Sequence, residues 1–134
     1  GQEPGLKAAR EGYEVVMCPA QHVYFDMAQT ENPLDRGVSW AAIISMEAAL
    51  DWDPVPLEEP ELEQNIIGIQ GALWSETICN DKDMDTMLVP RILALSEVSW
   101  SSTLRKRSLP EFMGTVNHFS RVLNQLGWES YHLD

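Results

Sequence analysis

Two short apolar segments constrain the fold of this chain more than any other feature. Tyr13–Cys18 is rich in apolar and β-branched residues and stops at Pro19, and Ile66–Trp74 is a second, nearly continuous apolar segment. Segments of this length without polar alternation are typical of strands buried on both faces. The glycines in the second segment indicate close packing against its backbone. The intervening stretches have helical periodicity, which predicts an α/β fold with right-handed βαβ units in a parallel sheet.

The expected helices surround these strands. The pattern predicts helices over residues 6–11, 39–50, 84–100 and 108–127. Ser39 is expected to cap the second helix, with Trp40 on its buried face. Pro90 is expected to kink the third helix or to mark its true first turn. Ser108 and Glu111 form a capping box at the start of the last helix. Between the first strand and the second helix, turn signals predict a long loop over residues 20–37.

The length of the chain sets a limit on this architecture. A closed (β/α)₈ barrel needs roughly 250 residues, whereas this chain has 134. A sheet of two parallel strands has two open edges and is not stable alone. The sequence therefore predicts that further strands pair with this sheet, from the rest of a longer polypeptide or from a second copy of the chain.

Composition excludes several kinds of partner and site. The formal net charge of −12 repels nucleic acids and anionic membranes, so neither is expected as a partner. No apolar run reaches the roughly 18 residues of a membrane span. Two cysteines cannot make a disulfide framework, and the three histidines have no ligand partners at metal spacing, so no metal site is expected. Residues 51–63 carry acids but no bases and are expected to form a solvated loop.

Clusters of aromatic and acidic residues follow both predicted strands. Tyr24 and Asp26 come after the first strand, and Trp74 and Glu76 end the second. The carboxyl ends of neighbouring parallel strands lie about 5 Å apart, so the two clusters should share one edge of the sheet. An aromatic ring covers the C–H face of a pyranose, and a carboxylate accepts hydrogen bonds from its hydroxyls. The pattern favours a carbohydrate site, although packed aromatic rings beside exposed acids remain an alternative on spacing alone.

Four stretches of this sequence resemble the family 20 glycoside hydrolases, the β-N-acetylhexosaminidases and chitobiases. They are residues 15–29, 36–40, 67–76 and 90–101, in matching order and spacing. The resemblance implies that residues 1–134 are the C-terminal segment of a (β/α)₈ TIM barrel, with strands seven and eight, their helices and a terminal helix. It also implies removal of terminal N-acetylhexosamine by substrate-assisted retaining hydrolysis, an exception to the two-carboxylate scheme. No cofactor is implied, and the family is typical of periplasmic, secreted or lysosome-like compartments.

The resemblance also implies roles for the four clustered residues. Tyr24 would be catalytic, donating a hydrogen bond to the substrate acetamido oxygen and orienting it for attack. Trp74 would form one wall of the acetamido pocket and exclude water. Asp26 and Glu76 would bind the distant hydroxyls of the terminal sugar.

One departure from the family pattern limits these expectations. The family's catalytic pair is an adjacent Asp-Glu, and no such dipeptide occurs in this sequence. The segment alone is therefore expected to be inactive. A non-catalytic carbohydrate-binding module and a purely structural interaction domain are the alternatives.

Overall fold

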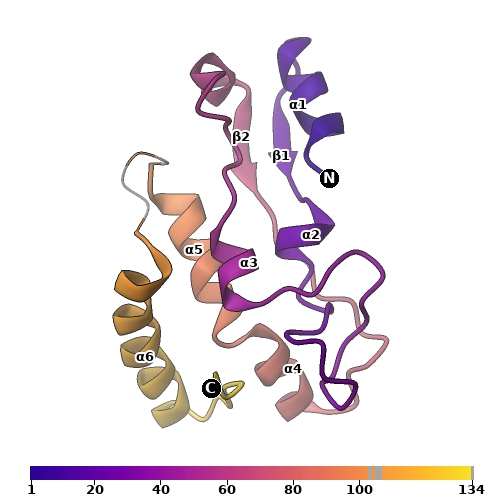
Figure 1. Cartoon of the computed structure of the whole chain (residues 1–134), viewed down its shortest axis with the longest axis vertical. Helices are drawn as coiled ribbons and strands as arrows, with labels where there is room; N and C mark the ends of the chain where they lie inside the picture. Colours follow the sequence, from indigo (N-terminus) through magenta and orange to yellow (C-terminus); the bar gives the residue numbers. More distant parts are fainter. Residues whose placement is uncertain (103, 105–106, 134) are drawn as a thin grey trace.

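A computed structural model describes residues 1–102, 104 and 107–133 of the chain. It has a two-stranded parallel sheet flanked by helices, so the predicted α/β class and strand direction are confirmed (Figure 1). The order of elements is α1 (Glu3–Arg10), β1 (Val15–Met17), α2 (Ala20–Val23), α3 (Met46–Leu50), the 3₁₀ helix η1 (Pro60–Gln64), β2 (Ile66–Ile69), α4 (Asp81–Leu88), α5 (Arg91–Trp100) and α6 (Leu109–Gln125).

Both strands are shorter than predicted, but their pairing resumes beyond their ends. After β1 the chain turns through α2, which lies inside the predicted loop. Tyr24 and Ala72 then form an isolated parallel bridge. The Phe25 N–H donates to the Ala72 carbonyl at 2.7 Å, and the Ala72 N–H donates to the Val23 carbonyl at 2.9 Å. The two chains therefore remain side by side where the predicted functional residues begin.

The expectation that both strands are buried on both faces is wrong for this chain. Met17 is buried against α1, and Ile66 also lies in the core. Val16, in contrast, is 49% exposed and Ile67 is 59% exposed. The physical reason is that helices of this chain cover one side of the sheet, while no other described segment covers these two side chains.

The predicted helix over residues 39–50 is also wrong for its first half. Only Met46–Leu50 is helical. The N-cap is Ser45 and not Ser39, and the Ser45 hydroxyl accepts a hydrogen bond from the Ala48 N–H at 3.1 Å. The preceding backbone is engaged elsewhere, since the Ile44 N–H donates to the Ala28 carbonyl at 2.9 Å. Tertiary hydrogen bonds have overridden the local helical pattern.

The predicted helix over residues 84–100 is two helices separated at Pro90. The first, α4, ends at Leu88, and α5 begins at Arg91 after a cis Val89–Pro90 peptide. Pro90 thus stands just before the first turn of α5, one of the two expected outcomes. The buried positions of α5 are Arg91, Ala94 and Val98, while Ile92 and Leu95 are half-buried.

The acidic segment and the last helix agree better with expectation. Residues 51–63 are an irregular connection that includes the start of η1, and Glu59 in it pairs with Arg10 at 2.7 Å. In α6 the Glu111 carboxylate accepts from the N–H and hydroxyl of Ser108 at 3.0 and 2.6 Å, which confirms the capping box. Gly127 follows the helix with φ +96°. Among the helices of the described ranges, none combines the length and hydropathy of a membrane span.

Candidate functional site

Two loops leave the same end of the sheet and are joined to each other. One follows β1 and the other follows β2, and both lie near α4 (Figure 1). Arg36 in the first loop pairs with Asp83 of α4 at 2.9 Å and donates to the Thr77 carbonyl in the second loop. The predicted shared edge is therefore present, with an arginine linking the two loops across it.

An exposed aromatic cluster lies at this edge. The rings of Tyr24 and Trp74 are 6.2 Å apart between centroids, at an interplanar angle of 60°. The Trp40 ring also contacts Tyr24, in an edge-to-face arrangement with the two ring centroids 6.1 Å apart. Trp74 is 52% exposed and Trp40 is 69% exposed, so both indole faces are open to solvent.

Trp40 was expected in the core, and the structure corrects that expectation. The reason is the missing first half of the predicted helix, because residues 39–45 are not helical and Trp40 lies against Tyr24 instead. One sequence signal pointed to this outcome, because Gly37 and the turn residues before it reverse the chain immediately ahead of Trp40. We refer to Tyr24, Asp26, Trp40, Trp74 and Glu76 together as the rim.

Asp26 is the buried acid of the rim. Its residue is 3% exposed, and its Oδ1 atom has no hydrogen-bond partner in the structure. Burial raises the pKa of the Asp26 carboxyl above its ordinary value, and the negative charge of Glu76 acts in the same direction. Backbone hydrogen bonds within Asp26 and from Trp74 oppose that rise in pKa. Glu76 itself is exposed on the loop after β2.

Two glycines allow the backbone to pack closely around Asp26. Gly37 has φ +123°, and a Cβ there would lie 2.6 Å from the Ala28 nitrogen and 2.8 Å from the Asp26 carbonyl oxygen. A Cβ on Gly71 would lie 2.8 Å from the Phe25 ring. Gly71 therefore confirms the expectation of close packing against the second strand segment. Gly68 does not, because nothing lies within 4 Å of the corresponding position.

A buried arginine lies beneath the same loop. Arg91 is fully buried and donates hydrogen bonds to the carbonyl oxygens of Phe25, Met27 and Ile44 at 2.6, 2.8 and 3.0 Å. Burial lowers the pKa of Arg91 to about 10, while the charge of Asp26 opposes that change. The sequence reasoning did not single out this residue, although a lone cation at the start of an apolar helical stretch was a visible signal.

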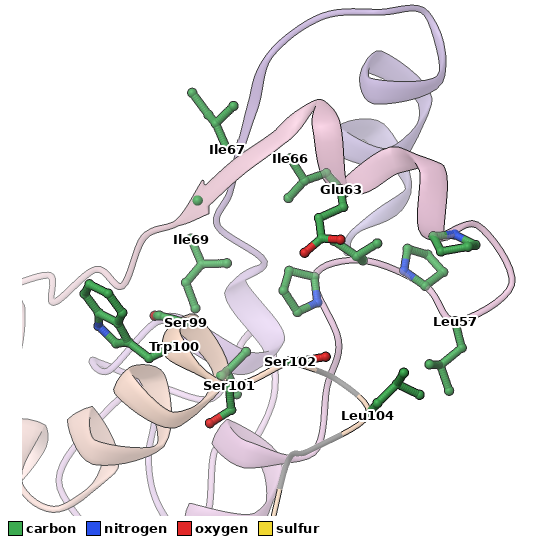
Figure 2. Close-up of a pocket in the computed structure, with 16 residues that line it drawn as sticks. Leu57, Glu63, Ile66, Ile67, Ile69, Ser99, Trp100, Ser101, Ser102 and Leu104 are labelled. Carbon is green, nitrogen blue, oxygen red and sulfur yellow. The ribbon is translucent and has the colours of Figure 1, made fainter.

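One well-defined groove lies away from the rim. A groove of about 660 Å³ runs between the 54–60 segment, β2 and the end of α5, and no rim residue lines it. In Figure 2 the Trp100 side chain lies at one end of this groove, and the Leu57 and Leu104 side chains lie at the other. No group of three metal-ligating side chains occurs in the described residues.

The rim thus combines two exposed indole faces, a phenol and two carboxylates. Flat apolar rings beside hydrogen-bond acceptors suit a ligand with one apolar face and several hydroxyls. All five side chains come from the two loops that follow the parallel strands.

Comparison with known proteins identifies relatives along most of the chain. Residues 1–103 match the family model described as glycosyl hydrolase family 20, catalytic domain. A β-hexosaminidase of Vibrio furnissii is 40% identical over 98 residues, covering 71% of this chain and 16% of that protein. A β-N-acetylhexosaminidase of Cellulomonas fimi is 30% identical over 125 residues, covering 93% of this chain and 25% of that protein.

A solved structure is similar over nearly the full length of the chain. It is an exo-β-N-acetylglucosaminidase of Vibrio harveyi in complex with N-acetylglucosamine, with a TM-score of 0.88 and 34% identity. The similarity covers 98% of this chain and 21% of that one. The chain therefore spans between about a sixth and a quarter of the length of these relatives.

Proposed function

The chain belongs to glycosyl hydrolase family 20, and from that premise we propose that it is the C-terminal part of the catalytic barrel of a β-N-acetylhexosaminidase. The whole protein would remove terminal N-acetylhexosamine from oligosaccharides or glycoconjugates by substrate-assisted hydrolysis. The observation that carries the proposal is the contact between Tyr24 and Trp74, whose rings lie 6.2 Å apart on loops that follow paired parallel strands. Catalytic residues of barrel enzymes gather in the loops at this end of the strands.

In this proposal β1 and β2 are strands seven and eight of a (β/α)₈ barrel. The remaining strands would come from the rest of the polypeptide and pair with the free edges of the sheet. The half-exposed Val16 and Ile67 support this idea, as does the apolar groove beside β2. A second copy of the chain is the other candidate to cover these surfaces.

Tyr24 would act on the reacting group of the substrate. Its hydroxyl would donate a hydrogen bond to the acetamido oxygen, which attacks the anomeric carbon of the same sugar. Holding an internal nucleophile in line for attack can contribute about 7–11 kcal/mol at best to lowering the barrier. Trp74 and Trp40 flank the Tyr24 ring. Trp74 would form a wall of the acetamido pocket and keep water from the developing charge.

Asp26 and Glu76 would recognise the far side of the terminal sugar. The unpartnered Oδ1 atom of Asp26 supports this role, since a buried acceptor without a partner is satisfied when a hydroxyl donates to it. Glu76 is exposed on the neighbouring loop and would accept from a second hydroxyl. Two acceptors on one side of the sugar would restrict binding to a chain end.

The experiment compares the full-length protein with residues 1–134 on a chromogenic N-acetylglucosaminide. We expect hydrolysis by the full-length protein and none by the segment, which has no Asp-Glu pair. Tyr24→Phe in the full-length protein should lower kcat by about 100-fold, because the acetamido oxygen loses its orienting donor. Tyr13→Phe is the control, since Tyr13 is 64% exposed and precedes β1, whereas the rim follows it.

Two results would overturn the proposal. One is hydrolysis by the isolated segment, because it would require a catalytic acid that we have not identified. The other is a Tyr24→Phe enzyme as active as the Tyr13→Phe control. If the full-length protein binds N-acetylglucosamine but does not hydrolyse the substrate, a carbohydrate-binding module replaces the enzyme as the function.

A further inference from the structure

Arg91 is a charged side chain buried completely beneath the rim. It begins α5, directly after Pro90, and has no exposed surface. Removing a cation from water is costly unless its N–H donors are satisfied. The partners that satisfy Arg91 are backbone carbonyls, and the structure gives no carboxylate within hydrogen-bond distance of it among the described residues. A buried arginine that binds main chain is suited to holding a loop in place.

The carbonyls that Arg91 binds come from three segments. The Nη2 atom donates to Phe25 at 2.6 Å, and the Nη1 atom donates to Met27 at 2.8 Å and to Ile44 at 3.0 Å. The third segment is α4, where Met87 accepts from both Nε and Nη2, at 3.2 and 2.7 Å. Arg91 therefore ties the start of the loop after β1 to its end beyond Trp40, and ties both to α4.

The residues on either side of Asp26 are the ones that Arg91 holds. Their carbonyls, of Phe25 and Met27, are fixed by Arg91 from one side. The carbonyl of Asp26 itself accepts from the Val38 N–H at 2.9 Å. Three consecutive carbonyls are thus held by partners from distant parts of the sequence, which leaves the Asp26 backbone little freedom.

We propose that Arg91 is a positioning residue for the sugar site, because it fixes the backbone around Asp26 and thereby sets where that carboxylate meets a sugar hydroxyl. The inference rests on the proposed function of the rim. Arginine suits the task because its planar fork presents five donors in fixed directions. A lysine ammonium is a compact group with three donors and cannot reach carbonyls from three segments at once.

The test is a double-mutant cycle in the full-length protein, with the inhibition constant of N-acetylglucosamine as the readout. Arg91→Lys and Asp26→Asn should each weaken binding by about tenfold or more, since a small displacement of a binding group is costly. The double variant should bind no more weakly than the worse single variant, because removing an already displaced carboxylate costs nothing further.

Arg107→Lys is the matched control. Arg107 also lies over a phenyl ring, 5.1 Å from the centroid of Phe112, and it pairs with Glu97 at 2.7 Å. Its side chain is 40% exposed, unlike that of Arg91, and its hydrogen bonds are made to Glu97 and Thr115 and not to the loop after β1. We expect Arg107→Lys to change the inhibition constant less than about twofold and to combine additively with Asp26→Asn.

The outcomes separate this inference from the proposed function. If Asp26→Asn leaves binding unchanged, Asp26 does not bind the sugar and the positioning role of Arg91 is overturned, while the Tyr24→Phe result still decides the proposed function. If Asp26→Asn and Arg91→Lys weaken binding additively, the sugar site stands and the positioning role of Arg91 is overturned. If Arg91→Lys does not fold, Phe25→Leu replaces it, removing only the ring 5.5 Å from the Arg91 guanidinium. Additivity of Phe25→Leu with Asp26→Asn would likewise overturn the inference.

Discussion

The loop end of the sheet and its exposed side differ in how they are stabilised. At the rim, Asp26 is 3% exposed, and Arg91 is fully buried beneath it and donates hydrogen bonds to the carbonyls of Phe25, Met27 and Ile44. On the exposed side of the sheet, Ile67 of β2 is 59% exposed, and Trp100 at the end of α5 is 90% exposed, although both side chains are apolar. The difference indicates that residues of this chain alone organise the loop of the candidate site. The side of the sheet, in contrast, exposes apolar side chains of the kind that a contacting segment or partner covers in other proteins.

The tight packing at the rim predicts the largest effect. Gly37→Ala in the full-length protein should lower the free energy of unfolding by about 3 kcal/mol, because a Cβ at φ +123° is strained and meets backbone atoms. Gly12→Ala is the control, since Gly12 has φ +91° but nothing within 4 Å of the added atom. It should cost about 1 kcal/mol, from the positive φ alone. Denaturant unfolding measures both variants, and equal losses would show that packing at Gly37 is looser than described.

The exposed side of the sheet gives the second prediction. Ile67→Asp should destabilise the full-length protein by about 2 kcal/mol, because other strands or helices would bury the new carboxylate. Leu34→Asp, at a position that is 90% exposed in a loop, should stay within about 0.5 kcal/mol of the parent. Thermal unfolding compares the two. An Ile67→Asp protein as stable as the Leu34→Asp control would argue against any covering layer on β2.

Substitution of Asp26 should have a smaller effect, and it should stabilise the protein where the previous substitutions destabilise it. Its pKa is raised in the folded protein by burial, so the unfolded state ionises more readily. The parent protein should therefore lose stability, relative to Asp26→Asn, as pH rises from the ordinary carboxyl pKa through the raised value. Above that window we expect Asp26→Asn to be more stable by about 1 kcal/mol, and below it the difference should vanish. Melting temperatures across the acidic range test this, and a pH-independent difference would contradict it.

The smallest expected effect concerns the tail after α6. The Tyr131 hydroxyl donates to the Asp35 carboxylate at 2.8 Å, and Thr30 donates to the same oxygen at 2.5 Å. Tyr131→Phe should cost about 0.5 kcal/mol and increase hydrogen exchange in residues 30–37. Tyr13→Phe, at an exposed position, should change neither quantity. Unchanged exchange in Tyr131→Phe would mean that the tail does not restrain this loop.

The sequence was sufficient for features that depend on local patterns. Two apolar segments predicted the parallel pairing, and the aromatic and acidic residues after them predicted a shared edge. The capping box of Ser108 and Glu111 was also recognisable, because both partners lie within one helical turn.

The failures occurred where distant residues compete with local preference. Residues 39–45 have a helical pattern, but the Ile44 carbonyl accepts from Arg91, 47 positions away. The same interaction explains why Trp40 lies beside Tyr24 and not in the core. Local periodicity could not indicate that Arg91, within an apolar helix, would bind main chain of the loop after β1.

The bridge between Tyr24 and Ala72 has a consequence for variation in chain length. Between the last pair of the sheet, Met17 with Ile69, and this bridge, the first segment has six residues (18–23) and the second has two (70–71). The extra residues form α2, so insertions or deletions near residues 19–22 can be absorbed without moving Tyr24 away from Ala72. A single insertion within residues 25–29, all of which are buried, has no such reservoir and would rotate the Asp26 side chain away from its present direction. We therefore expect homologous or engineered chains to vary in length before the bridge and to keep a constant length over residues 25–29.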